Sequence, residues 1–189
     1  MCIRDSPETT LLCLEEAYID FVDDNFVPEI SLDKKNVIRM RTFSKAYGMA
    51  GLRVGYAIGE KGLILNFEKI RNHFGMSRIS QVGALAALED YEFISDVINK
   101  VKLSRNRIAE IANNNNCKFI PSFTNFVAID CLKDSKFAKK VLENLINNGV
   151  FVRMPYSYPQ NRCIRVTVGL DKDIDLFEKY FPIALKNAN

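Results

Sequence analysis

The feature that most constrains the fold is a short, unbroken apolar run near the start of the chain. Residues 11–14 read LLCL, and two acids, Glu15 and Glu16, follow at once. A run of this length without alternation is typical of a strand buried on both faces, as in a parallel sheet. Two further strands are predicted over residues 37–43 and 54–58. The sequence therefore predicts an α/β fold.

The spacing of apolar residues predicts helices after these strands. Apolar side chains fall on one face of residues 61–73, and the small apolar residues of 80–88 predict a packed helix. From Tyr91 onward, apolar residues repeat near the helical period as far as an asparagine run at 113–116. We expect one long amphipathic helix there, which joins two domains.

The last part of the chain predicts a small α+β unit. A helix is expected to be capped by Ser135 and to end at Gly149 in a left-handed turn. A final helix is expected from Asp171, with a kink or restart at Pro182. Strands are predicted over residues 126–129, 150–153 and 163–168. We found no internal repeat.

The predicted domain organisation follows from these patterns. Residues 1–90 form part of a large domain, residues 91–116 form an interdomain helix, and residues 117–189 form the small domain. Residues 1–6, MCIRDS, resemble translated sequencing adapter and contribute to no predicted element. The sequence is therefore expected to be a piece of a longer protein.

Composition excludes several classes of function. The net charge of +3 comes from 26 basic and 23 acidic residues with no basic block, so no nucleic-acid partner is predicted. No apolar run approaches a membrane span, so no membrane partner is predicted. The odd cysteine count without a CxxC pair predicts neither a disulfide framework nor a metal site, and suits a reduced cytoplasmic compartment. The cysteines are Cys2, Cys13, Cys117, Cys131 and Cys163.

Lys45 lies in the segment that carries most chemistry, residues 41–56, RTFSKAYGMAGLRVGY. It follows a predicted strand, and ligands gather at the carboxyl ends of strands in open α/β sheets. Desolvation in such a crevice makes the neutral amine available as a nucleophile. Ser44 and Arg53 could hold a phosphate. This pairing suits pyridoxal 5'-phosphate (PLP), which carries an aldehyde and a phosphate.

The whole segment resembles the PLP-lysine signature of the fold-type I aminotransferases, most closely the histidinol-phosphate aminotransferase group. That signature reads T-(F/L)-S-K-x-x-G-x-A-G-x-R-x-G-Y, and every fixed position is met between Thr42 and Tyr56. The resemblance implies that Lys45 binds the cofactor as a Schiff base and then moves the substrate Cα proton. It implies that Thr42, Ser44 and Arg53 help bind the cofactor. It also implies a three-layer αβα PLP-binding domain with a mostly parallel sheet.

The acids after the first strand belong to a second matching segment. Residues 15–21, EEAYIDF, are similar to the D-E-A-Y-x-x-F of the group. There the first acid pairs with the pyridine nitrogen, and the tyrosine donates to the ring oxygen, which implies these roles for Glu15 and Tyr18. A carboxylate at this place keeps the ring protonated. Because Glu15 is one methylene longer than the usual aspartate, an acid without a cofactor role is the alternative.

Residues 121–126, 149–153 and 164–169 resemble small-domain elements of the same group. The resemblance implies that Arg165 binds the substrate carboxylate, for which a guanidinium fork is suited, and that Arg153 helps hold the substrate. For both, the alternative is a solvated strand arginine.

Residues 71–78, RNHFGMSR, depart from the proline-rich stretch that histidinol-phosphate enzymes usually carry here. This departure weakens the assignment to that one substrate. His73 is interpreted as structural, since Lys45 already supplies the proton shuttle, and Arg78 is a candidate phosphate ligand.

The function that the resemblance implies is PLP-dependent transamination between an L-amino acid and a 2-oxo acid or related carbonyl partner. It implies a cytoplasmic homodimer in amino acid biosynthesis. An aromatic amino acid aminotransferase and a PLP-dependent decarboxylase are alternatives of the same fold, and a degenerate, non-catalytic PLP-binding protein is one of another class. The resemblance covers the C-terminal half of a family member, so this chain alone is expected to be inactive.

Overall fold

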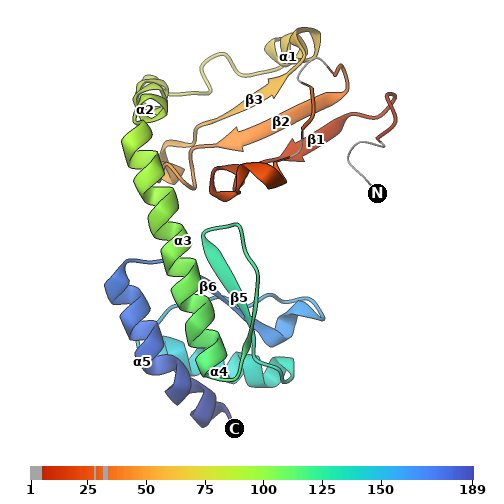
Figure 1. Cartoon of the computed structure of the whole chain (residues 1–189). Coiled ribbons are helices and arrows are strands. Elements are labelled where there is room, and N and C mark those ends of the chain that lie inside the picture. The colour runs from red at the N-terminus through yellow and green to blue at the C-terminus, as the bar shows by residue number, and fades with distance from the viewer. Residues whose placement is uncertain (1–5, 28, 32–33) are drawn as a thin grey trace. The chain divides into compact units, whose positions relative to one another are not determined.

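The computed structural model describes residues 6–27, 29–31 and 34–189 (Figure 1). The adapter-like residues 1–5, with Cys2, and Pro28, Leu32 and Asp33 lie outside the described residues. Contacts divide the chain into two units, residues 1–98 and 99–189, with the division inside the long helix α3 (Tyr91–Asn114). The domain boundaries given above remain a prediction.

The first unit is built on a three-stranded sheet. Its strands are β1 (Leu12–Glu15), β2 (Val37–Thr42) and β3 (Gly55–Gly59), in the order β1-β2-β3. β1 runs parallel to β2, with Glu15 opposite Met40, and β3 runs antiparallel to β2, with Gly55 opposite Thr42. The short 3-10 helices η2 (Ile19–Phe21) and η3 (Asp24–Phe26) follow β1. All three predicted strands are confirmed.

The burial of β1 differs from the prediction. Val37 and Ile38 of β2 are buried, whereas Leu11 and Cys13 are exposed. β1 is one of the two edge strands of the described sheet, and its side chains alternate between a covered and an open face. An unbroken apolar run shows what a strand can bury, but it does not show what covers the strand.

The helices of the first unit are α1 (Lys61–Glu68) and α2 (Arg78–Glu89). α1 ends five residues before the predicted end at 73, because the apolar side chains beyond it, such as Ile70, are exposed and gain nothing from a further turn. α2 begins at the cap Ser77, whose hydroxyl accepts from the backbone N–H of Ser80. The predicted packing of α2 is only partly right, since Val82 and Leu85 are exposed.

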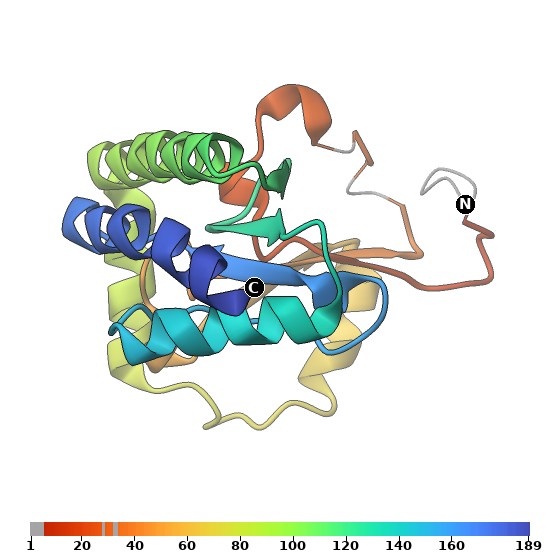
Figure 2. The same ribbon diagram turned by 90° about the horizontal axis from the view of Figure 1, so that it is seen from below.

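The second unit is an antiparallel sheet covered by helices on one face. Its elements beside α3 are β4 (Lys118–Ile120), β5 (Phe126–Asp130), α4 (Ser135–Asn147), β6 (Cys163–Thr167) and α5 (Asp171–Ala188). The strand order is β4-β5-β6, and α4 and α5 lie side by side along the sheet (Figure 2). β4 was not predicted. The predicted strand at 150–153 pairs only at Arg153, opposite Arg165.

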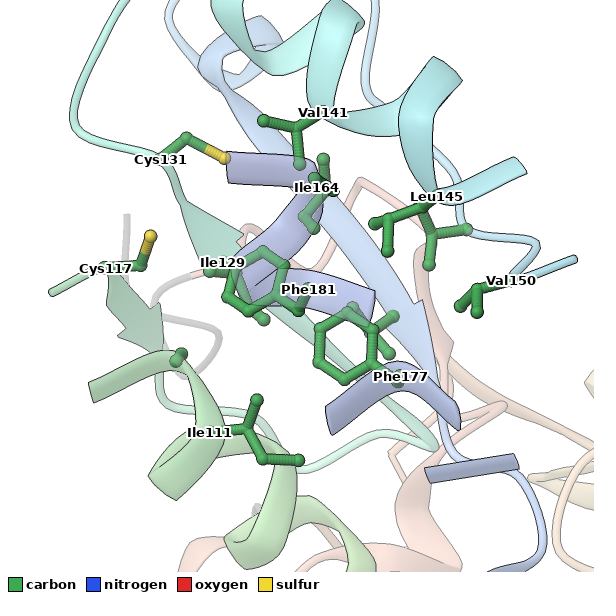
Figure 3. Packing of buried hydrophobic residues seen from close by; sticks show 14 of the residues in the cluster. Ile111, Cys117, Ile129, Cys131, Val141, Leu145, Val150, Ile164, Phe177 and Phe181 are labelled. Carbon is green, nitrogen blue, oxygen red and sulfur yellow. The ribbon is translucent and has the colours of Figure 1, made fainter. Parts of the chain in front are cut away.

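The core of the second unit lies between the helices and one face of its sheet (Figure 3). Val127, Ile129 and Cys131 alternate along and just beyond β5 and all enter this core. Phe177 and Phe181 of α5 stack against one another there, with ring centroids 4.9 Å apart. On β6, Ile164 and Val166 also enter the core, and Arg165 between them faces the other side of the sheet. The alternation therefore separates the core from the face that carries charge.

Three helix boundaries refine the predictions. The cap of α4 is Asp134, one residue before the predicted Ser135, and its carboxylate accepts from the N–H of Phe137. Gly149 has a φ of +78°, which confirms the left-handed turn. α5 continues through Pro182 without a restart, since Phe181 and Ala184 on either side are buried. Within the described residues, no helix has the length and hydropathy needed to cross a bilayer.

Candidate active site

Lys45 lies on a tight loop that leaves β2 and returns to β3. The N–H of Phe43 donates to the carbonyl of Val54 at 3.2 Å, and the N–H of Met49 donates to the carbonyl of Phe43 at 2.9 Å. The N–H of Gly48 closes the turn on the carbonyl of Lys45 at 3.0 Å. These bonds fix the backbone on both sides of the lysine, so the loop holds its side chain on a rigid base.

Two glycines are required by the shape of this loop. Gly48 has a φ of +68°, in the left-handed region that residues other than glycine adopt only at an energetic cost. A Cβ on Gly55 would lie 2.7 Å from the carbonyl oxygen of Arg41 in the neighbouring strand. Only glycine lets β3 approach β2 this closely where the loop begins and ends.

The loop is anchored on α2 by an apolar cluster and a hydrogen bond. Phe43 and Val54 pack against Ala84 of α2, and the ring of Phe43 lies 4.9 Å from that of Tyr47. The hydroxyl of Ser80 donates to the carbonyl of Leu52 at 2.7 Å. The sequence string thus forms a packed structural unit in which Phe43 points inward and Lys45 does not.

The structure brings Lys45 next to Tyr18. The ammonium Nζ lies 5.2 Å from the centroid of the tyrosine ring, within the range of a cation–π contact. Tyr18 follows β1 and Lys45 follows β2, and these strands are parallel. Their carboxyl ends therefore meet at one edge of the sheet, the place where α/β proteins bind ligands.

Thr42 and Ser44 are joined beside the lysine, whereas Arg53 turns elsewhere. The hydroxyl of Thr42 donates to that of Ser44 at 2.9 Å and accepts from its backbone N–H at 3.1 Å. Arg53 has a φ of 50° and donates from Nη1 to the carbonyl of Ala50 at 2.7 Å. Its side chain lines a recess of about 370 Å³ with Ser77 at the start of α2. His73 and Arg78, on the segment before and into α2, are exposed.

The two acids after β1 have different surroundings. Glu15 is exposed, and its carboxylate accepts from the N–H of Ala17 at 3.0 Å. Glu16 is only 7% exposed, and its carboxylate binds Arg39 at 2.6 Å and Arg41 at 2.9 Å. Sequence reasoning missed this pair of ion pairs. The two arginines, two apart on a strand, show in the sequence that they share a face, but not which acid they bind.

A half-buried acid and a tyrosine lie close to these ion pairs. Burial raises the pKa of Asp20 above its ordinary value, although the nearby charge of Arg41 opposes the shift. Burial, followed by the charge of Asp20, also raises the pKa of Tyr47. Asp20 and Tyr47 are therefore titratable groups near Arg41 that the sequence did not single out.

In the second unit, Arg153 and Arg165 face one another across an antiparallel bridge. The N–H of Arg153 donates to the carbonyl of Arg165 at 3.0 Å, and the reverse bond is 2.6 Å. Residues directly opposite on antiparallel strands project on the same side of a sheet. The bridge thus sets two guanidinium groups on one face, and both line a cavity of about 780 Å³.

The surroundings of Arg165 suit an anionic ligand. Its guanidinium carbon lies 4.7 Å from the ring centroid of Phe126, which holds the group flat. Its Nε is buried and finds no hydrogen-bond acceptor in the part of the chain that the structure describes. A buried donor without an acceptor is costly, and a bound carboxylate or phosphate would satisfy it. The rest of the cavity wall is mostly apolar, with Met154 and Tyr156 among its residues.

Comparison with known proteins identifies the family. The model of "Aminotransferase class I and II" matches residues 6–176, nearly the whole chain. This chain belongs to the aminotransferase class I and II family. Its sequence is 40% identical over 166 residues to the histidinol-phosphate aminotransferase of Bacillus velezensis, covering 86% of this chain and 45% of that protein. It is 35% identical over 185 residues to histidinol-phosphate aminotransferase 2 of Legionella pneumophila, covering 96% and 48%.

Solved structures of this family share the fold. A histidinol-phosphate aminotransferase from Sinorhizobium meliloti in complex with pyridoxal-5'-phosphate matches with a TM-score of 0.92 and 46% identity, covering 97% of this chain and 51% of that one. An aspartate aminotransferase from Thermotoga maritima, at 21% identity and a TM-score of 0.79, shows the fold alone. The predicted fold class is confirmed. This chain spans about half the length of the relatives it matches.

Proposed function

We propose that this chain forms part of a PLP-dependent aminotransferase that moves an amino group between an L-amino acid and a 2-oxo acid or phosphorylated carbonyl partner. One observation carries the proposal, namely the amine of Lys45 5.2 Å from the ring centroid of Tyr18 at the ends of parallel strands. The names of the relatives, histidinol-phosphate aminotransferases at 35–40% identity, support it.

The donor set of the first unit fits PLP group by group. A primary amine, a phenol and a carboxylate, from Lys45, Tyr18 and Glu15, stand at the ends of β1 and β2. They match an aldehyde, a ring oxygen and a ring nitrogen. The hydroxyl of Ser44, held by Thr42 at 2.9 Å, matches a phosphate oxygen. When bound, PLP supplies an aldehyde that takes the amino group and a ring that takes up the electron pair left at Cα.

Lys45 is the residue that we assign to proton transfer. Its amine can accept the proton from the substrate Cα and return it to the carbon of the PLP aldehyde group. Both transfers are general acid–base catalysis. The loop bonds through Gly48 and Met49 fix the backbone from which the side chain extends. The loop therefore fixes where the base is attached, and the flexible side chain of Lys45 lets its amine reach the substrate.

Glu15 and Tyr18 are assigned to the ring and Ser44 and Arg53 to the phosphate. A carboxylate at Glu15 holds a proton on the ring nitrogen, and the Tyr18 hydroxyl can donate to the ring oxygen. Arg53, which now donates to the carbonyl of Ala50, would have to share its guanidinium with the phosphate. A guanidinium has five N–H donors, so both bonds can be made at once.

Arg165 and Arg153 are assigned to the substrate. The orphaned Nε of Arg165 favours a planar carboxylate, which a guanidinium binds through two parallel bonds. Arg153 stands opposite on the same face, where it can hold a second anionic group. Two guanidinium groups side by side support a substrate with more than one negative charge, such as a phosphorylated amino acid.

We also propose that the whole protein is a cytoplasmic homodimer in amino acid biosynthesis, as the family resemblance implies. Its support is the resemblance alone. Sedimentation of the full-length protein tests the dimer, and a single species at the monomer mass would exclude it.

Borohydride trapping tests the cofactor site on this chain. The chain is incubated with PLP, reduced, digested with trypsin and mapped by mass spectrometry. We expect one adduct, on Lys45, in the peptide from Thr42 to Arg53. The variant Lys45→Arg should lose it, whereas Lys69→Arg, at an exposed lysine of the same unit, should keep it. Labelling scattered over surface lysines would refute a formed site in this chain.

A further inference from the structure

The second unit holds a pair of thiols that the proposed function does not use. Cys117 precedes β4 and Cys131 follows β5, and both are free thiols in the core cluster, 8% and 5% exposed. Figure 3 shows both side chains at the margin of that cluster. Two of the five cysteines of the chain thus meet one core from different strands.

The register of the sheet places these two cysteines at neighbouring strand ends. β4 pairs antiparallel with β5, and Lys118 opposite Asp130 is the last pair of this ladder. Cys117 and Cys131 are the residues one step beyond that pair, where a continued register would set them opposite one another. Facing residues of antiparallel strands have Cα atoms about 4.5–5.5 Å apart, and disulfides form at about 4.4–6.8 Å. Both side chains enter the same core, so they lie on the same face of the sheet.

The third buried cysteine of this region is placed differently. Cys163 begins β6 and faces Asp130, not Cys131, and it is outside the core cluster. Neighbouring residues of a strand point to opposite faces, so Cys131 and Cys163 are directed away from one another. A bond between them would require the backbone to move, whereas a bond between Cys117 and Cys131 would not.

We propose that Cys117 and Cys131 are a redox-responsive thiol pair that a small-molecule disulfide converts to an intramolecular disulfide. The Cys117 thiolate attacks one sulfur of the small disulfide, forms a mixed disulfide and releases one small thiolate. Cys131 loses its proton to solvent and attacks the sulfur of Cys117, releasing the second. Two protein thiols are oxidised, and one small disulfide is reduced to two thiols.

The electrostatics of the pair agree with this order of events. Interaction with Cys131 lowers the pKa of Cys117. Interaction with Cys117, followed by burial, raises the pKa of Cys131. Cys117 also follows Asn116, a turn residue with a φ of 55°, at the exposed end of α3. Cys131 is likewise followed by an exposed turn residue, Leu132 with a φ of 57°, so both thiols border the surface and Cys117 is the one that ionises first.

The bond would tie the segment after α3 to the end of β5. β5 lies beside β6, the strand that carries Arg165. Closing a loop of about fifteen residues stabilises a fold by restricting the unfolded chain. We expect oxidation to raise the melting temperature of the chain by roughly 5–10 °C. The inference does not depend on the cofactor, and a chain that fails the borohydride test can still pass this one.

Peptide mapping of the oxidised chain tests the proposal. The reduced chain is incubated with oxidised glutathione, alkylated with N-ethylmaleimide and digested with trypsin without reduction. Trypsin places the three cysteines in separate peptides, residues 108–118, 119–133 and 163–165. We expect a cross-link between the first two, and a melting temperature that rises on oxidation and falls again with dithiothreitol.

Two variants provide matched controls. Cys163→Ser should keep both the cross-link and the rise in melting temperature, and Cys117→Ser should lose both. A cross-link to residues 163–165, or recovery of the first two peptides only in alkylated or glutathionylated form, would overturn the proposal. The map of the unaltered chain decides the question even where Cys117→Ser fails to fold.

Discussion

Nη2 of Arg39 lies 2.6 Å from Oε1 of Glu16, and both side chains are almost fully buried. The other carboxylate oxygen of Glu16 binds Arg41 at 2.9 Å, so one acid from the end of β1 holds two arginines of β2. Its neighbour Glu15 remains exposed at the strand end. Two adjacent, chemically identical acids therefore have different surroundings.

Glu16→Gln should destabilise the first unit by about 3 kcal/mol. The substitution keeps the size of the side chain but removes the charge, which leaves two arginines without their shared partner. Breaking a buried ion pair from one side costs about 3–5 kcal/mol because the remaining charge is still desolvated. Urea denaturation followed by circular dichroism measures the change.

Glu68→Gln is the matched control for that experiment. Arg71 Nε also lies 2.6 Å from a carboxylate oxygen of Glu68, but both side chains are about half exposed. Exposed pairs contribute only about 0–1 kcal/mol, since water solvates the charges either way. Equal losses in the two variants would show that burial does not govern the strength of the Glu16 pairs.

Gly55→Ala should cost about 1–3 kcal/mol, because the new Cβ would lie 2.7 Å from the backbone carbonyl of Arg41. The two strands would have to separate at the point where the Lys45 loop begins. Gly51→Ala in the same loop meets nothing within 4 Å and should be neutral or stabilising by up to about 1 kcal/mol. Thermal melts of both variants make the comparison, and a harmless Gly55→Ala would refute the close approach.

Local pattern predicted the elements that depend on few neighbours. α3 follows from its helical period, β1 from its apolar run, and the turn at Gly149 from the absence of a side chain. The segment around Lys45 was recognisable because Gly48, Gly55 and Phe43 are required by the loop itself. These features are determined by residues close together in the sequence, so the sequence alone contains the information.

Features determined by distant partners could not be predicted in this way. Glu15 and Glu16 look alike in sequence, and only the register of β1 against β2 gives the second acid two arginines. β4 is three residues long, too short to show alternation. The exposure of Val82 on α2 likewise depends on what packs beside the helix, which its own period does not reveal.

Asp20→Asn should change how stability depends on pH. Burial raises the pKa of Asp20 above its ordinary value of 3.8, so the folded state holds this proton more tightly than the unfolded state. The stabilisation is fully present below pH 3.8 and is lost as the pH rises through the raised pKa. The asparagine variant should therefore gain stability relative to the parent between acid and neutral pH. Urea midpoints that shift in parallel over this range would contradict the assignment.

Two substitutions at Glu15 separate its charge from its reach. In the full-length protein, Glu15→Gln should lower transamination about 100-fold, because an amide no longer holds a proton on the ring nitrogen. Glu15→Asp should retain at least the parent's activity, since it keeps the charge and has the length common in the family. A Glu15→Gln enzyme with full activity would show that Glu15 has no role toward the cofactor, the alternative given for this acid in the sequence analysis.

Arg165→Lys should weaken substrate binding more than it slows the chemical step. Lysine keeps the charge but loses the planar fork and the contact with Phe126 at 4.7 Å. Loss of a charge-assisted hydrogen bond costs about 1.5–3 kcal/mol, so KM for the amino donor in the full-length protein should rise roughly 10–100-fold. Arg107→Lys, at a partly exposed arginine paired with Asp175, should leave KM unchanged. An effect on kcat alone would mean that Arg165 acts on the reacting groups and does not hold the carboxylate.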